Sequence, residues 1–163
     1  MTTEDACHFE VLLPIARQAA FALVVDKPFL WWSSPFEPGD DPKRGVAEVE
    51  IEPQPGGLCH EIGADGVRRV WGTVLSIEYP LYLRLAWQVS PDKTLITDPA
   101  AASRVMMTFR DAGTMSRLEV DHTEFVRHGE GGQTYRSLMN GPGGWPRLLD
   151  NIVAVAGAKD RRS

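Results

Sequence analysis

The sequence predicts an α+β fold in which a curved antiparallel sheet of about six or seven strands wraps around a long C-terminal helix. Three observations predict it. Short segments alternate apolar and polar residues, two pairs of these segments flank tight glycine turns, and an amphipathic helical pattern lies near the end of the chain. Such a sheet leaves a space between its concave face and the helix. We expect a central ligand cavity where side chains do not fill that space.

The N-terminal part of the chain predicts one strand and one helix. Residues 8–13 place Phe9, Val11 and Leu13 on one face at a period of two. Residues 15–25 follow a helical spacing that ends where Pro28 approaches. Four large apolar residues at 29–32 then precede the segment 33–45, which is rich in Pro, Gly and Asp and predicts a loop.

The middle of the chain predicts a strand followed by a hairpin. Residues 46–52 alternate, with Ala47, Val49 and Ile51 facing inward and three glutamates facing solvent. Residues 58–62 and 67–77 flank an Asp65-Gly66 turn, in which glycine supplies the positive φ that a tight hairpin needs.

The C-terminal half predicts three more strands and two helices. A strand after Pro80 has one apolar face, formed by Leu81, Leu83, Leu85 and Trp87. Residues 103–110 and 116–125 form a second hairpin. A short helix over 134–139 is followed by a longer amphipathic helix over 145–156.

Composition and charge exclude several classes of protein. The 163 residues are 43% hydrophobic and 24% charged, which fits one globular domain spanning 1–163. The net charge of −5 and the absence of a long basic stripe argue against nucleic-acid binding. We expect no membrane span, because no apolar stretch approaches the roughly 18 residues that a span needs. We expect a cytoplasmic protein, because the N-terminus lacks the pattern of a signal peptide. Cys7 and Cys59 are far apart in sequence, and we expect reduced thiols.

Several short motifs, taken in order, resemble one known family. They are IARQAAFALVV before Trp31-Trp32, PGG at 55–57, DG at 65–66, WGTVLSIEYPLYLRLAWQ, and the closing HGEG and GGWPRLL. The chain resembles the Hsp90 ATPase activator-homologue group of the START-like superfamily, also called SRPBCC, which includes polyketide cyclases and the birch-pollen allergen. The resemblance implies a helix-grip fold with a cavity between the sheet and the C-terminal helix. It does not choose among the functions found on that fold.

Aromatic residues supply most of the candidate ligand contacts. Five tryptophans are many for a domain of this size, and the resemblance places Trp32, Trp87 and Trp145 at positions that line or close the cavity. The competing interpretation is that the tryptophans fill a close-packed core. The predicted ligand-binding residues are Trp32, Trp71, Trp87, Met107, His122 and Trp145.

The histidines give weaker signals. His8 with Glu10 and His122 with Glu124 each share a strand face by the period of two, but no further ligand at metal spacing accompanies either pair, so we expect no metal and no cofactor. His122 follows the inward positions of its strand. It is the best candidate for a polar group in the cavity, although the pattern favours a hydrogen-bonded core histidine over that role.

Two further motifs carry no predicted chemistry. His60 and Glu61 are adjacent, so their side chains point to opposite faces of a strand. The glycines after His128 match no phosphate-binding loop, and no serine or cysteine lies in a nucleophile motif.

Three functions follow as hypotheses. The first is binding or sensing of a small apolar or aromatic ligand in the cavity. The second is cyclase-like or hydrolase-like catalysis, with His122 and either Glu61 or Asp121 transferring protons. The third, suggested by the name of the family, is regulation of a chaperone ATPase through an exposed surface. A homodimer through an edge strand also stays open.

Overall fold

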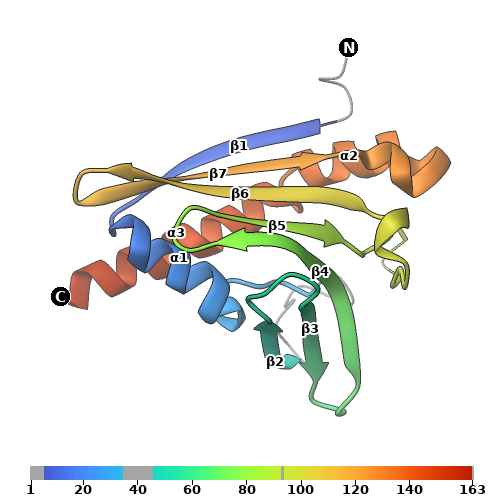
Figure 1. Cartoon of the computed structure of the whole chain (residues 1–163), viewed down its shortest axis with the longest axis horizontal. Coiled ribbons are helices and arrows are strands. Elements are labelled where there is room, and N and C mark those ends of the chain that lie inside the picture. Colours follow the sequence, from blue (N-terminus) through green and yellow to red (C-terminus); the bar gives the residue numbers. More distant parts are fainter. Residues whose placement is uncertain (1–5, 35–45, 93, 163) are drawn as a thin grey trace.

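The computed structural model describes residues 6–34, 46–92 and 94–162 of the chain. Seven strands form one antiparallel sheet in the order β1-β7-β6-β5-β4-β3-β2, so that the first and second strands of the chain lie at opposite edges. Figure 1 shows that the sheet curls, with β3 and β4 bending away from the long strands β6 and β7. The predicted fold class is therefore confirmed.

The helices and strands occur in the predicted order along the chain. The strands are β1 (Ala6–Leu13), β2 (Val46–Ile51), β3 (Leu58–Gly63), β4 (Arg68–Glu78), β5 (Tyr82–Trp87), β6 (Ser103–Ala112) and β7 (Met115–Thr123). The α-helices are α1 (Arg17–Asp26), α2 (Gly132–Asn140) and α3 (Trp145–Arg162). The 3-10 helices within the described ranges are η2 (Pro28–Leu30), η3 (Pro99–Ala101) and η4 (Phe125–Gly131). No helix in the described ranges is long and apolar enough to cross a bilayer.

Glycine turns close both predicted hairpins. Gly66 has φ +83° between β3 and β4, and Gly113 has φ +74° between β6 and β7. Residues with a Cβ rarely adopt this conformation, so these turns require glycine or a residue of similar tolerance. The loop predicted at 33–45 lies largely outside the described residues.

Irregular pairing curves one half of the sheet. The pairing shifts by one residue within β2–β3, β3–β4 and β4–β5, whereas β5, β6 and β7 pair without interruption. Such bulges bend a strand and increase its twist, which accounts for the curl over β2 to β4.

Two predicted orientations are wrong for the same kind of reason. Ala47 is exposed, not inward, because the pairing of β2 with β3 shifts between Val46 and Glu48. Leu81 is 37% exposed because it lies in the turn before β5, whereas Leu83 and Leu85 within that strand are buried. A period of two therefore predicted burial only where the strand is regular.

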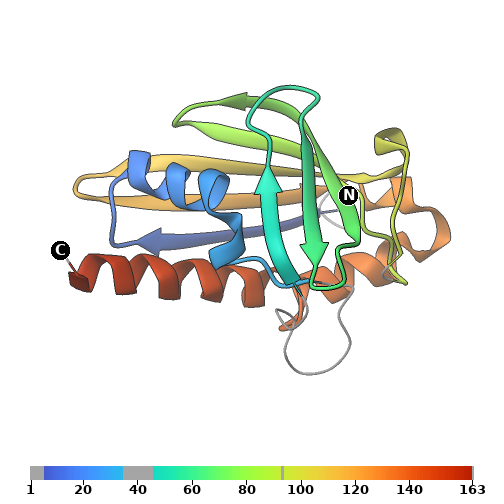
Figure 2. The same ribbon diagram turned by 90° about the horizontal axis from the view of Figure 1, so that it is seen from below.

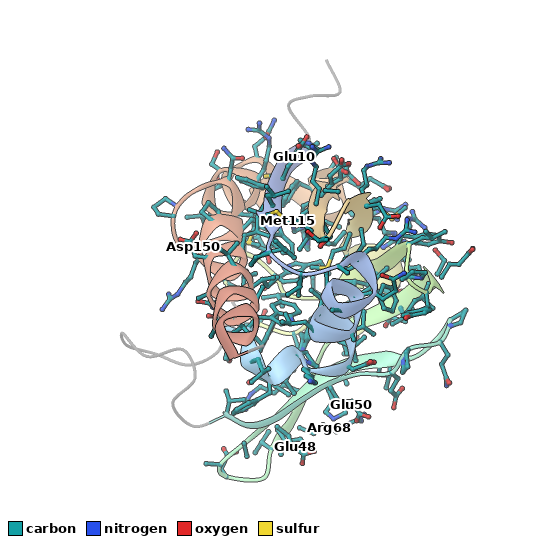
Figure 3. The ribbon with its side chains drawn as sticks, turned by 90° about the vertical axis from the view of Figure 1, so that its left-hand side faces the viewer. Glu10, Glu48, Glu50, Arg68, Met115 and Asp150 are labelled. Carbon is teal, nitrogen blue, oxygen red and sulfur yellow. The ribbon has the colours of Figure 1, made fainter. Side chains whose placement is uncertain are left out.

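The helices α1 and α3 cover the inner face of the sheet. Figure 2 shows α3 running the length of the molecule beside β1, with α1 next to it. Figure 3, seen along this layer, shows side chains filling the space between the helices and the sheet, while Asp150 points outward from α3. The core is continuous, and it includes residues of both helices and of every strand of the sheet.

Candidate functional site

A pocket of about 550 Å³ opens at one end of the layer between the sheet and the helices. It lies where the segment after η2, the end of β5, and the turn from α2 to α3 come together. Its aromatic walls are Trp32, Trp87 and Tyr135, and Leu138 and Leu148 add aliphatic surface. A volume of this size suits a small organic molecule.

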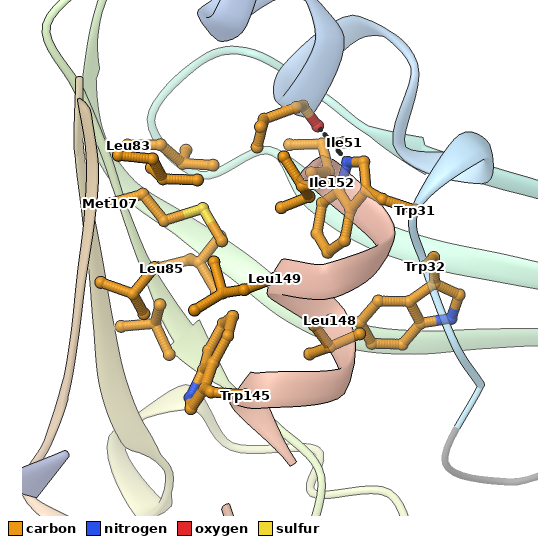
Figure 4. Packing of buried hydrophobic residues seen from close by; sticks show 14 of the residues in the cluster. Trp31, Trp32, Ile51, Leu83, Leu85, Met107, Trp145, Leu148, Leu149 and Ile152 are labelled. Atoms are coloured by element: carbon orange, nitrogen blue, oxygen red, sulfur yellow. Dashed lines mark hydrogen bonds between the residues drawn. The ribbon is translucent and has the colours of Figure 1, made fainter. Parts of the chain in front are cut away.

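Trp32 is held firmly as one wall of the pocket. Its indole stacks on Trp71 with ring centroids 4.0 Å apart and an angle of 16° between the planes. Its backbone N–H donates to the carbonyl of Pro28 at 2.9 Å, which ties it to the start of η2. Figure 4 shows Leu148 of α3 pointing toward this ring. Stacking and hydrogen bonding thus leave the indole little freedom to reorient.

A buried carboxylate fixes the same wall from behind. Glu61 on β3 is fully buried and accepts hydrogen bonds from Trp32 Nε1 at 2.8 Å and from Ser34 Oγ at 3.0 Å. The nearest cationic group is the Arg69 guanidinium, 4.0 Å from Glu61 Oε2. Since Trp32 and Ser34 line the pocket and Glu61 does not, the carboxylate acts through the wall residues and not by direct contact with the pocket space.

His60, the neighbour of Glu61, faces the other side of the sheet. Its Nδ1 lies 3.3 Å from the Arg68 guanidinium and its Nε2 lies 3.7 Å from the Glu50 carboxylate. Figure 3 shows Glu50 and Arg68 together at this outer edge. The two adjacent side chains therefore point to opposite faces, although both are buried.

The second wall of the pocket joins β5 to α2. Trp87 Nε1 donates a hydrogen bond to the Tyr135 hydroxyl at 2.8 Å. Burial raises the pKa of Tyr135, so the hydroxyl keeps its proton at physiological pH. The hydroxyl uses one lone pair for Trp87 and retains its own proton for another acceptor, and Tyr135 lines the pocket.

The segment that carries Trp32 is also tied to α3. Asn151 Nδ2 donates to the Trp31 carbonyl and to Ser33 Oγ, both at 3.0 Å. Trp31 itself donates from Nε1 to the Val24 carbonyl at 3.1 Å, the bond drawn in Figure 4. The pocket is thus built from elements fixed to one another by buried polar contacts.

Behind the pocket, His122 belongs to a hydrogen-bonded chain of side chains. Trp145 Nε1 donates to His122 Nδ1 at 2.9 Å, so the neutral imidazole carries its proton on Nε2, which lies 2.7 Å from Ser103 Oγ. Ser103 Oγ in turn lies 2.7 Å from His128 Nε2. His122 is fully buried, and burial followed by the neighbouring His128 lowers its pKa well below the usual value. This histidine is neutral and hydrogen-bonded inside the core.

The six predicted ligand-binding residues separate into two groups. Trp32 and Trp87 line the pocket. Trp71 lies behind Trp32, and Met107, His122 and Trp145 lie in the packed interior. Tyr135 and Arg147 line the pocket but were not predicted. Both sit in helices that were predicted, yet no local pattern indicates which residues of those helices meet the end of β5.

The two predicted histidine–carboxylate pairs differ in the structure, because His8 Nε2 lies 3.3 Å from Glu10 whereas Glu124 pairs with Arg127 and not with His122. On the outer face of the sheet, His8 Nδ1 lies 2.7 Å from the Asp121 carboxylate, and the hydrogen bonds to Asp121 and Glu10 raise the pKa of His8. Glu124 has a left-handed backbone after the end of β7, and its carboxylate accepts from Arg127 at 2.8 Å. The described residues contain no group of three or more His, Cys, Asp or Glu side chains that could hold a metal ion.

Neither carboxylate predicted to pair with His122, Asp121 or Glu61, contacts it in the structure. Asp121 lies on the outer face of β7 beside His8, whereas His122 lies inside, because successive residues of a strand point to opposite faces. Glu61 is inside, but Trp32, Ser34 and Arg69 are its partners. The structure therefore does not join either carboxylate to His122.

Comparisons with known proteins agree on the family and the fold. The model of the family "Activator of Hsp90 ATPase homolog 1-like protein" matches residues 21–157. No curated protein matches the chain.

Solved structures match over almost the whole chain. An anthrahydroquino-γ-pyrone synthase, Txn09, is 25% identical with a TM-score of 0.66, and the match covers 93% of this chain and 98% of that one. The self-sacrificing resistance protein CalC from Micromonospora echinospora is 22% identical with a TM-score of 0.67, covering 96% of each chain. A protein from Nitrosomonas europaea, NE0264, is 11% identical with a TM-score of 0.68, covering 98% of each.

Proposed function

Because the chain belongs to the family of Activator of Hsp90 ATPase homolog 1-like proteins, we propose that it binds a small, largely apolar molecule in the pocket beside Trp32 and Trp87. The observation that carries the proposal is the pocket itself. Aromatic and aliphatic side chains line its walls, and the Tyr135 hydroxyl offers a proton to a ligand acceptor. A mostly apolar lining with a few placed polar groups is typical of small-molecule sites.

The way the walls are fixed supports binding over simple packing. Trp32 and Trp87 keep their orientations through hydrogen bonds to Glu61 and Tyr135. A ligand that meets a preformed wall loses less free energy to ordering the protein than one that must organise it. The described pocket is thus suited to a flat aromatic molecule placed against the indoles.

Catalysis in the same pocket is a second candidate, favoured by the 25% identity to a protein whose name describes a synthase. Among the residues that line the pocket, Tyr135 is the group best placed to donate a proton to a bound carbonyl. In this scheme Tyr135 would be the proton donor in place of His122. If Tyr135 is the proton donor of a reaction, the Tyr135→Phe variant should lose turnover and largely keep its affinity for the ligand.

The pocket can be tested with a neutral fluorescent probe, N-phenyl-1-naphthylamine. Its emission rises in apolar surroundings, so a titration gives the affinity and stoichiometry of binding. We expect saturable binding of one probe per chain, competed by any natural ligand. If the protein instead works as a chaperone regulator through an exposed surface, the probe is not expected to find a specific site.

A matched pair of glycine variants locates the binding. Gly143 lines the pocket and a Cβ there would meet nothing within 4 Å, so Gly143→Leu fills the pocket without a clash at Cβ. Gly157 in α3 has the same free space at Cβ but does not line the pocket, so Gly157→Leu is the control. The proposal predicts that only Gly143→Leu loses the probe. Equal binding by both variants would remove this pocket as the site.

A further inference from the structure

We propose that the pocket selects an anion, a molecule with an apolar aromatic body and one acidic group that lies against Arg147. The inference rests on the proposed function, because it names the chemical class of ligand for the same pocket. The acidic group would be a carboxylate, a sulfonate or an acidic phenol, which share the property of accepting hydrogen bonds while carrying one negative charge.

The charges of the lining residues are the first argument. Among the described residues that line the pocket there is no Asp, Glu, Lys or His, and Arg147 is the one that carries a charge at neutral pH. The chain as a whole has a net charge of −5. The chain as a whole repels anions, but Arg147 gives the pocket a local positive charge that attracts them.

The place of Arg147 in α3 is the second argument. It is the third residue of this 18-residue helix, and the first turn holds no acidic residue. The aligned peptide dipoles give a first helical turn partial positive charge, which favours anions and disfavours cations. In α3 this is an effect of the dipoles alone, because the N–H groups of Arg147 and Leu148 donate to the Gly144 carbonyl. An arginine in the first turn adds to this positive charge, whereas a carboxylate would balance it.

The Arg147 guanidinium has no anionic partner within the parts of the chain that the structure describes. Five of the other described arginines form ion pairs, with Asp111, Glu61, Glu119, Glu10 and Glu124. Arg147 is exposed and joins none of these carboxylates. A bound anion would supply the negative charge that both the guanidinium and the helix end lack.

The deeper polar group of the pocket fits the same ligand. The Tyr135 hydroxyl accepts from Trp87 and keeps its own proton to donate to a ligand. Arg147 and Tyr135 can therefore both donate hydrogen bonds to one anionic ligand. A cationic molecule would find no carboxylate among the described residues of the pocket wall.

Two dyes that differ by one sulfonate test the inference. N-Phenyl-1-naphthylamine is neutral, and 1-anilinonaphthalene-8-sulfonate has the same aromatic body with one negative charge. The ratio of their affinities therefore isolates the effect of the charge. We expect the wild-type protein to prefer the sulfonate, and this preference to weaken as NaCl is raised, since salt screens an exposed charge.

Substitution of Arg147 supplies the decisive comparison. Arg147→Gln should weaken sulfonate binding about fivefold or more while leaving the neutral dye unchanged, because a charge-assisted hydrogen bond is lost. Arg147→Lys should keep part of the preference. The control is Arg117→Gln, which makes the same change in net charge on the outer face of β7, 3.7 Å from Glu10. It should keep the wild-type ratio.

The two proposals fail in different ways. If both dyes bind in the pocket and the ratio is the same in wild type and Arg147→Gln, the anion preference is overturned while the binding function stands. If Arg117→Gln lowers the ratio as much as Arg147→Gln, net charge explains the preference and Arg147 does not. If neither dye depends on Gly143, the proposed function itself fails.

Discussion

Two regions of the space between sheet and helices hold the same kinds of side chain but differ in what surrounds them. The closed region, around Trp145 and His122, is packed on all sides and its polar atoms bond to one another. The pocket region, around Trp32, Trp87 and Tyr135, is packed on one side only and faces the pocket on the other. Aromatic residues fill the core in the first region and form walls in the second.

The difference teaches where a site arises in this fold. Trp87 and His122 lie on strands of the same sheet with ring centroids 5.6 Å apart, yet only Trp87 lines the pocket. The start of α3 determines which of the two rings meets the pocket. Trp145 is fully buried, whereas the preceding turn at 141–144 lines the pocket. The competing interpretations of the tryptophans, core or cavity, therefore each apply to a different part of the set.

The largest expected effect is on the closed region. Trp145→Ala removes a fully buried indole and the donor to His122, and should lower the free energy of unfolding by about 3–5 kcal/mol. Urea denaturation followed by circular dichroism measures it. Leu138→Ala, at an exposed pocket residue, is the control and should cost far less. Equal losses would erase the distinction between the two regions.

A smaller effect is expected where the pocket wall depends on one hydrogen bond. Tyr135→Phe keeps the ring and removes the acceptor of Trp87 Nε1, which should cost about 1–3 kcal/mol because a buried donor is left unpaired. The same denaturation experiment measures it. An unchanged stability would mean that the indole N–H is not shielded at this wall.

The pH dependence of stability separates a buried from an exposed histidine. His122 has a pKa below that of the unfolded chain, so between the two values only the unfolded state takes up its proton. Stability should therefore fall as pH drops below about 6.5, by up to about 1.4 kcal/mol per pH unit. Unfolding midpoints from pH 8 to pH 5 measure it, and His122→Asn should flatten the slope.

The effect of His8 on the pH dependence of stability is opposite to that of His122. Its pKa is raised by hydrogen bonds to Asp121 and Glu10, so its stabilising effect is present below the unfolded pKa and is lost as pH rises through the folded value. His8→Gln should therefore steepen the loss of stability on acidification. A variant of His8 that flattened the slope would contradict the assignment of the effect to His122.

The smallest expected effect is at the turn that borders the pocket. Gly143→Ala should change the free energy of unfolding by less than about 0.5 kcal/mol, because the added Cβ meets no atom within 4 Å. Gly144→Ala should be clearly destabilising, since its Cβ would clash with the Met139 backbone, including the carbonyl oxygen. Thermal melts of the two variants compare them. A similar cost for both would show that this turn does not border open space.

The sequence predicted the fold well because local patterns determine most of it. The period of two over β6 and β7, and the positive φ required at Gly66 and Gly113, predict the hairpins without reference to the rest of the chain. The errors at Ala47 and Leu81 come from a bulge and a turn, which a short window does not reveal.

The site was predicted only in part because its contacts join distant residues. Trp32 meets Glu61 29 positions away, and Trp87 meets Tyr135 48 positions away. Alternation indicates that Trp87 faces inward but not which end of a helix covers it. The single charge of Arg147 gains meaning only when the other lining residues are known to be uncharged.

Native mass spectrometry of the protein purified from the cells that naturally produce it tests the central claim most directly. A ligand held with nanomolar affinity, about −12 kcal/mol, survives purification. The account predicts one added mass per chain, that of an organic acid, present in wild type and Gly157→Leu and missing from Gly143→Leu. An added mass retained in full by Gly143→Leu would place the ligand elsewhere and contradict the account.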